Sequence, residues 1–227
     1  MRRGFFTALA IARKDLRTEL RTKESLNASA SFALVILVLF SFAFDLDREE
    51  LYAISGGLLW LVYSFAGAMI VNRSFSRELP NDCLDVLVAS PAPGWSIFLG
   101  KSLAAFALLI AVELISLPVF GLFYNIRWMG VFWPLFIIML LATWGMTVVG
   151  TGLSALTVNV RLRELMLPAL LYPLLIPVLI AAMQLTTALL SSEPVSLATD
   201  SELRLLVVFD IVYTSLALYL IEFILVL

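Results

Sequence analysis

Residues 165–182 read LMLPALLYPLLIPVLIAA, a run without a single charged side chain. The apolar core of a bilayer is about 30 Å thick, and a helix needs about 20 apolar residues to cross it. This run is therefore typical of a membrane-spanning helix. The whole chain agrees, because 62% of its 227 residues are hydrophobic, 14% are charged, and the mean hydropathy is +1.01. Such a composition excludes a water-soluble core and indicates an integral membrane protein.

Five further apolar stretches are long enough to cross a bilayer. The expected spans are residues 27–44, 51–72, 97–124, 129–158, 165–190 and 203–227. They leave room for almost no soluble domain, so we expect one all-α transmembrane domain over residues 1–227. The residues before the first span are charged and mixed, without a convincing cleavage site, which favours a retained helix over a signal peptide. Proline removes a helix hydrogen bond, so we expect kinks at Pro118, Pro168, Pro173 and Pro177.

The distribution of basic residues predicts the orientation of the spans. With the N-terminus in the cytoplasm, twelve of the fifteen Lys and Arg residues lie on the inner side. Inner loops of membrane proteins carry such an excess, and an even number of spans returns the C-terminus to the same side. We therefore expect both termini to be cytoplasmic. Aromatic rings often anchor spans at the membrane interface, and this position is expected for Trp60, Tyr63, Trp128 and Trp133.

The first 26 residues have the periodicity of an amphipathic helix. Apolar positions recur every three or four residues, and basic residues fall elsewhere on the wheel. The apolar positions are Phe5, Leu9, Ala12, Leu16 and Leu20, and the basic ones are Arg13, Lys14, Arg17 and Arg21. Such a helix is suited to lie along the inner leaflet of the bilayer. The alternative is a basic leader that only sets the topology.

Residues 73–96 form a long polar connection between the second and third spans. Asn81 or Asp82 can cap a short helix with an apolar edge of Leu84, Leu87 and Val88. The sequence SPAPG at residues 90–94 then ends that helix. A short helix joined to two spans can transmit force from a soluble partner that binds its edge. The alternative is a cytoplasmic loop packed against neighbouring helix ends.

The chain has no catalytic motif. It lacks a phosphate-binding loop of the GxxxxGK[ST] type, so any nucleotide hydrolysis must come from another subunit. It contains no histidine and one cysteine, Cys83, which excludes imidazole ligation of haem iron, an internal disulfide and a CxxC redox site. We therefore expect no enzyme activity, no metal site, no cofactor bound by the chain itself and no nucleic-acid partner.

Three acidic residues lie inside expected spans. Glu113 is near the middle of the third span, Asp210 is about two turns from the outer end of the sixth, and Glu222 is near its inner end. A charge at the bilayer centre is costly, so Glu113 is expected to face the protein interior, protonated or hydrogen-bonded. It is either part of a substrate or proton path or a hydrogen-bonding strut between helices.

The polar connection resembles that of the ABC-2-type permeases, the membrane halves of ATP-driven exporters. The matching residues are Arg77, Glu78, Asp82, Leu84, Leu87, Ser90, Pro91, Gly100 and Lys101. The family's usual Gly-Thr-Leu-Glu core is Asp82-Cys83-Leu84-Asp85 here. The resemblance implies an ATPase-coupling interface formed by Arg77, Glu78, Asp82, Leu84, Asp85, Leu87, Pro91 and Lys101.

Within that superfamily the chain is most similar to the haem exporter protein B family. The likeness rests on the length, the six spans, residues 165–182 and the stretch GTGLSALTV at residues 150–158. The resemblance implies a permease of the bacterial cytoplasmic (inner) membrane, with haem as possible cargo and ATP on a partner subunit. The implied partners are an ABC ATPase subunit, a haem-handling membrane subunit, a small membrane adaptor and a second copy of the chain. ATP hydrolysis would drive haem export or release of a haem-loaded chaperone.

Three other functions remain open from the residues alone. A general ABC-2 exporter of a lipid, drug or glycan has the same architecture. A proton-coupled secondary transporter would use Glu113 and Asp210 as proton carriers, although the chain has no obvious inverted repeat. A scaffold that only holds the haem-handling subunit is the third alternative.

Overall fold

The computed structural model describes residues 2–43, 48–79, 89, 92–158, 160, 162–191 and 197–224. These residues are almost entirely helical, and no strand occurs among them. The helices are α1 (Arg2–Thr22), α2 (Glu24–Ala43), α3 (Arg48–Ser76), α5 (Gly94–Phe123), η2 (Met129–Val131), α6 (Phe132–Thr157), α7 (Arg163–Leu190) and α8 (Leu197–Ile224).

Six of these helices, α2, α3, α5, α6, α7 and α8, are long and apolar enough to cross a membrane. The structure confirms the expected all-α membrane fold. Helix ends differ from the expected spans by a few residues. For example, α3 covers the expected 51–72 and continues to Ser76. Hydropathy marks only the apolar part of a helix, whereas backbone hydrogen bonding continues through its polar ends.

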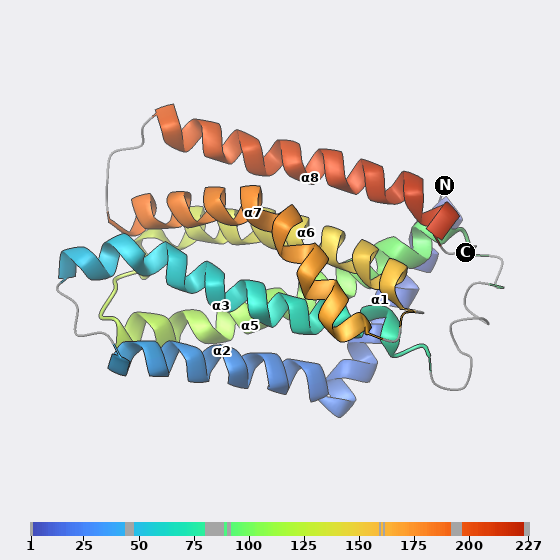
Figure 1. Ribbon diagram of the computed structural model, residues 1–227, viewed down its shortest axis with the longest axis horizontal. Helices are drawn as coiled ribbons and strands as arrows, with labels where there is room; N and C mark the ends of the chain where they lie inside the picture. The colour runs from blue at the N-terminus through green and yellow to red at the C-terminus, as the bar shows by residue number, and fades with distance from the viewer. Residues whose placement is uncertain are drawn as a thin grey trace.

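The six long helices form an elongated bundle along one axis. Figure 1 shows α8 at one edge, α2 at the opposite edge, and the start of α1 near the end of α8. Of the six, α3 is the most buried and α2 and α8 are the least buried. The centre of the bundle is therefore built around α3, with α5, α6 and α7 packed against it.

Proline lies inside two of the helices without ending either one. Pro118 lies in α5, and three prolines, Pro168, Pro173 and Pro177, lie in α7. Each proline removes one backbone hydrogen bond and crowds the preceding turn. Consistent with this, the ribbon of α7 bends visibly along its length (Figure 1).

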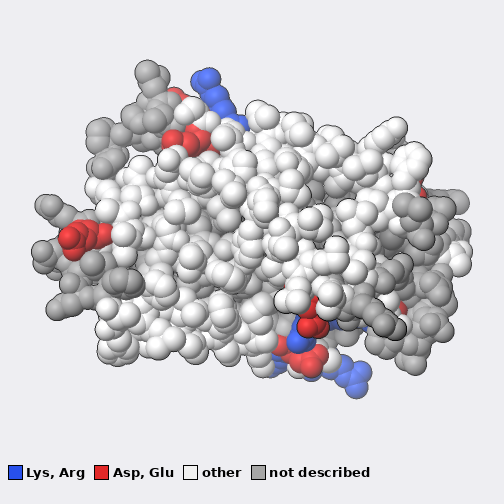
Figure 2. Space-filling model, viewed as in Figure 1, with Lys and Arg blue, Asp and Glu red and all other residues white. Residues whose placement is uncertain are grey.

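The outer surface is apolar where lipid would touch it. Exposed side chains on α2, α7 and α8 include Val35, Leu39, Ile176, Ile211 and Phe223. Figure 2 shows a broad central region of one face without Lys, Arg, Asp or Glu, with charged residues toward its ends. In lipid, an apolar exterior costs nothing, because the surrounding hydrocarbon chains are equally apolar.

Two of the expected interfacial aromatics are in the core. Trp60 and Tyr63 are each 1% exposed, so their assignment to the membrane interface was wrong. Trp60 Nε1 donates a hydrogen bond of 2.9 Å to Thr186 Oγ1 on α7. By contrast, Trp133 is 73% exposed. The sequence shows how far along a span an aromatic residue lies, but not which face of the helix carries it. Because α3 has neighbours on nearly every side, Trp60 and Tyr63 are buried.

Candidate functional site

Charged side chains gather where α1, α2, the end of α3 and the start of α5 meet. We call this set the charged cluster. It comprises Lys14, Asp15, Glu19, Arg77, Glu78 and Lys101. Three bases are balanced by three acids, so the cluster as a whole is neutral, as a partly buried set of charges must be.

Lys101 lies at the centre of the charged cluster. Its side chain is fully buried, and its Nζ lies 3.3 Å from Asp15 Oδ2 and 3.0 Å from Glu78 Oε1. The third donor reaches the backbone carbonyl of Ser74 at 2.9 Å. The ammonium group also lies 5.1 Å from the centre of the Phe75 ring. All three ammonium donors thus have partners, as a buried ammonium group requires.

Arg77 and Glu19 make the second buried contact of the cluster. The Arg77 guanidinium donates to the carboxylate of Glu19 and to Ser25 Oγ. The other oxygen of Glu19 accepts the backbone N–H of Leu26 at 2.8 Å, near the N-terminus of α2. Glu19 is 0% exposed and therefore connects α1, the start of α2 and the turn after α3. A carboxylate at this position also interacts favourably with the positive end of the α2 dipole.

The electrostatics of the cluster favour ionised partners. Burial alone would raise the pKa of Glu78, but the charge of Lys101 and hydrogen bonds from Lys14 and Lys101 outweigh it and lower that pKa. Burial lowers the pKa of Lys14, and its contacts with Glu78 and Asp15 more than compensate, so the net shift is upward. Both shifts stabilise the charged forms.

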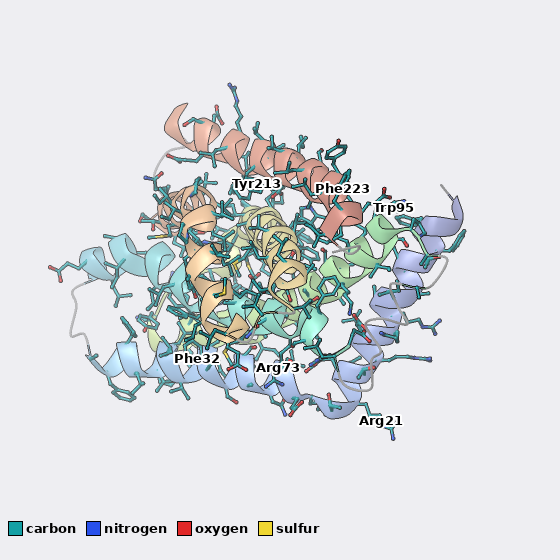
Figure 3. All side chains as sticks on the ribbon, turned by 45° about the vertical axis from the view of Figure 1, so that its right-hand side comes forward. Arg21, Phe32, Arg73, Trp95, Tyr213 and Phe223 are labelled. Carbon is teal, nitrogen blue, oxygen red and sulfur yellow. The ribbon has the colours of Figure 1, made fainter. Side chains whose placement is uncertain are left out.

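The helix α1 reaches this position by a sharp corner. Lys23 has φ 56°, a left-handed conformation that ends α1 and redirects the chain into α2. Figure 3 shows Arg73 beside this corner and Arg21 pointing away from the bundle. Arg73 Nη1 lies 3.4 Å from Glu24 Oε2, an exposed ion pair across the same corner.

Two glycines allow α1 to approach α5 closely. A Cβ on Gly100 would lie 2.6 Å from the backbone oxygen of Ala8, and a Cβ on Gly4 would lie 2.4 Å from the Trp95 ring. Neither position has room for a side chain. The charged cluster and this tight contact together fasten α1 to the bundle.

The exposed face of α1 is partly apolar. Phe5, Leu9 and Leu20 are more than half exposed, whereas Ala12 is buried against the protein. The expected helix is therefore present over Arg2–Thr22. Its contact with the inner leaflet stays a prediction, carried by these exposed apolar residues.

The residues predicted to contact an ATPase divide into two groups. Arg77, Glu78 and Lys101 come together in the charged cluster. Asp82, Leu84, Asp85, Leu87 and Pro91 lie outside the described residues. The cluster thus lies at the base of the segment between Leu79 and Ala92, and the direct contact with a partner stays a prediction.

Sequence reasoning missed the α1 members of the cluster. Asp15 and Glu19 lie four residues apart, on the same face as the buried Ala8, Ile11 and Ala12. Their spacing could have indicated that they face the protein, because the two acids fall on the same face of a mostly basic helix as its small apolar residues.

A second polar site lies in the middle of the bundle. Glu113 on α5 is 0% exposed, and its Oε1 accepts a hydrogen bond of 2.6 Å from Thr143 Oγ1 on α6. Its Oε2 is buried and has no hydrogen-bond partner among the described residues. Ser116 Oγ donates to the Glu113 carbonyl at 3.1 Å and lies 3.5 Å from the Tyr63 hydroxyl. Glu113 therefore faces the protein interior, between α3, α5 and α6.

Asp210 belongs to a different contact. Its Oδ1 lies against Gly145 of α6, where an added Cβ would be 2.6 Å away. Gly145 is two residues beyond Thr143, or roughly 200° around the helix. The structure therefore places Glu113 and Asp210 on opposite faces of α6.

The chain has clear relatives. The model of the CcmB protein family matches residues 6–224. The chain is 29% identical to Heme exporter protein B of Rhodobacter capsulatus over 176 residues, covering 78% of this chain and 80% of that protein. It is 29% identical to Heme exporter protein B of Pseudomonas aeruginosa over 191 residues, covering 83% and 84%. The protein of the same name from Haemophilus influenzae is 28% identical over 175 residues, covering 77% and 78%. With a family match across nearly the whole chain and six membrane helices, this protein is a member of the CcmB family of multi-pass membrane proteins.

Proposed function

We propose that the chain is the permease subunit of an ABC transporter complex that acts in cytochrome c biogenesis. The observation that carries this proposal is the CcmB match over residues 6–224, together with relatives named Heme exporter protein B. The cargo is haem, or the energy is used to release a haem-loaded chaperone. ATP is hydrolysed by a separate subunit, since the sequence has no phosphate-binding loop.

The segment between Leu79 and Ala92 is the proposed contact with the ATPase subunit. Support comes from the way its base is held. On one side Arg77 and Glu78 bind α1, and on the other Lys101 binds both α1 and Glu78. A displacement of the segment would then move α1, α3 and α5 together, because ion pairs and close glycine contacts prevent these helices from shifting independently. This arrangement suits a subunit that receives mechanical work from outside the membrane.

The remaining partners follow from the family. We propose a second copy of this chain, a haem-handling membrane subunit and a small membrane adaptor, in the bacterial inner membrane with both termini cytoplasmic. The excess of Lys and Arg on one side supports the orientation. Because the chain has no histidine, any contact with haem would be through apolar, aromatic or Met side chains.

Co-purification from native membranes tests the proposal. The tagged chain is extracted in mild detergent, its partners are identified by mass spectrometry, and vanadate-sensitive ATPase activity is measured with and without haem. An ATPase together with a haem-binding membrane subunit is the expected result. An ATPase alone would point to a general exporter, and no ATPase would refute the ABC assignment in favour of a secondary transporter.

A charge-reversal pair locates the contact. Asp82→Lys with Asp85→Lys should remove the ATPase from the purified complex while leaving membrane insertion and the haem-handling subunit in place. The matched control, Asp200→Lys with Glu202→Lys, changes the same charge at the start of α8, and should keep the ATPase. Retention of the ATPase by the first variant would show that the contact lies elsewhere.

A further inference from the structure

Among the residues that the structure describes, no countercharge lies beside Glu113. Its carboxyl is fully buried, and no Lys or Arg contacts it among the described residues. An ionised carboxylate without a partner in an apolar interior is far more costly than a neutral carboxyl group. Oε1 accepts the hydrogen bond from Thr143, and Oε2 has no hydrogen-bond partner among the described residues.

Buried hydroxyls lie on only one side of Glu113 along α6. From Thr143 toward Phe132, the buried residues of α6 are apolar, namely Ala142, Met139, Ile138 and Leu135. From Thr143 toward the other end, buried hydroxyls recur as Thr147, Thr151, Ser154 and Thr157. Thr147 and Thr151 follow Thr143 at intervals of four residues, so the three form a row on one face of the helix. Thr151 Oγ1 has no hydrogen-bond partner among the described residues.

A cavity lies at the charged cluster, on the side of α5 that carries Ala104 and Ala105. It has a volume of about 30 Å³ and is lined by Asp15, Arg77, Glu78 and Lys101, and also by Ala105 and Leu108 of α5. This volume is enough for one or two water molecules. The Glu113 to Thr143 bond fixes the antiparallel register of α5 and α6. Eight residues along each helix, a rise of about 12 Å, bring Thr151 level with Ala105.

We infer that Glu113 is a proton-binding site that exchanges its proton with the end of the bundle that holds the charged cluster. The route is the threonine row of α6, residues 143, 147 and 151, followed by the cavity beside Ala105. Successive hydroxyls are about 6 Å apart along the helix, so the route requires water to enter between them. Only O–H bonds form and break, so no other reactant is required. The buried residues of α6 between Thr143 and Phe132 are apolar, so they offer the proton no route toward the other end of the bundle.

The other titratable groups near this path are few. On α3, the hydroxyl of Tyr63 lies 3.5 Å from the backbone oxygen of Glu113. On α8, Asp210 lies across α6, on its far face. On α5 itself, Lys101 is twelve residues away and is bound in the charged cluster. None of these groups supplies a positive charge to the carboxyl of Glu113.

Infrared spectroscopy tests the inference without requiring transport. The complex is purified in lipid nanodiscs at neutral pH, and the C=O stretching band of a protonated carboxyl is recorded during transfer into D₂O. Glu113→Gln assigns the band, and an Asp210→Asn background removes a second intramembrane carboxyl group. We expect a Glu113 band that shifts on deuteration, with exchange slowed roughly tenfold by Thr151→Val, equivalent to about 1.4 kcal/mol in the barrier.

Two matched variants separate a route from a packing effect. Thr151→Ser keeps the hydroxyl and should exchange at the wild-type rate. Ser29→Ala removes another buried hydroxyl that has no partner among the described residues, on α2, and should also leave the rate unchanged. Absence of the carboxyl band would show that Glu113 is ionised. Equal exchange rates in Thr151→Val and Ser29→Ala would place the route elsewhere, and either result would overturn the inference.

Discussion

Replacing the buried lysine of the charged cluster is the sharpest test of what holds α1 to the bundle. Lys101→Met keeps most of the side-chain volume and removes the ammonium group that binds Asp15, Glu78 and the Ser74 carbonyl. Removing one partner of a buried ion pair typically costs about 3–5 kcal/mol, because the other charge is left unpaired. Lys14 still lies within 3.2 Å of Asp15 and 2.6 Å of Glu78. We therefore expect a value near the lower limit, about 3 kcal/mol.

Trypsin reports this loss directly. Arg13, Arg17 and Arg21 are exposed on α1, but cleavage requires the helix to open locally. When opening and closing are fast, the cleavage rate follows the open population, so about 3 kcal/mol corresponds to roughly a hundredfold faster cleavage. The control Arg127→Met lies outside the cluster, between α5 and α6, and should cleave at the wild-type rate.

A combined variant distinguishes charge from packing. Adding Asp15→Asn and Glu78→Gln to Lys101→Met removes the unpaired acids, and cleavage should return to within about tenfold of wild type. If the combined variant were cleaved faster than Lys101→Met alone, or if Lys101→Met behaved like wild type, the cluster would not be what fastens α1.

The same cluster predicts a pH dependence. The pKa of Glu78 in the folded protein lies below its ordinary 4.5. Its ion pairs therefore stabilise the fold fully above that ordinary value, and the contribution is lost as pH falls through the folded pKa. Release of α1 should accelerate on acidification below about pH 4.5, and less steeply in Glu78→Gln, as measured by an acid-active protease such as pepsin.

Further substitutions test the other contacts. Gly100→Val should separate α1 from α5, because even a Cβ would lie 2.6 Å from the Ala8 carbonyl, at a cost of about 1–3 kcal/mol measured by the same tryptic assay. Glu113→Gln should be tolerated better than Glu113→Leu, judged by folded yield in detergent, because the amide oxygen still accepts from Thr143. Equal yields would argue against a bonded strut. Lys23 has φ 56°, a conformation that glycine adopts easily and valine does not. Lys23→Gly should therefore be neutral or stabilising, and Lys23→Val should destabilise the fold by about 1–2 kcal/mol, as measured by thermal unfolding. The opposite order of stabilities would show that residue 23 does not need a left-handed backbone.

Much of the fold was predictable because membrane insertion is governed by composition. The six spans follow from runs such as residues 165–182, since a helix is the only structure in which a single segment satisfies its own backbone in lipid. The amphipathic helix before the first span followed from spacing alone and is present over Arg2–Thr22. The helix ends were predicted less accurately, because the apolar stretch of a helix is shorter than its hydrogen-bonded backbone.

The site was predicted less well, because the sequence does not show how each helix is rotated about its own axis. Glu113 was expected to face inward because a charge in lipid is costly, and it does. Trp60 and Tyr63 were expected at the interface but are buried, because hydropathy gives no information on which face of a helix meets its neighbours.

The sequence by itself determined that this chain is a six-span helical membrane protein of a recognisable family, since span length and apolarity are properties of single segments. Only the tertiary structure decided that Asp15 and Glu19, far from Arg77 and Lys101 in sequence, complete one neutral cluster. It also decided that Thr143 is the partner of Glu113. Such pairings depend on the packing and rotation of whole helices, which is settled by the sum of many small contacts rather than by any local motif.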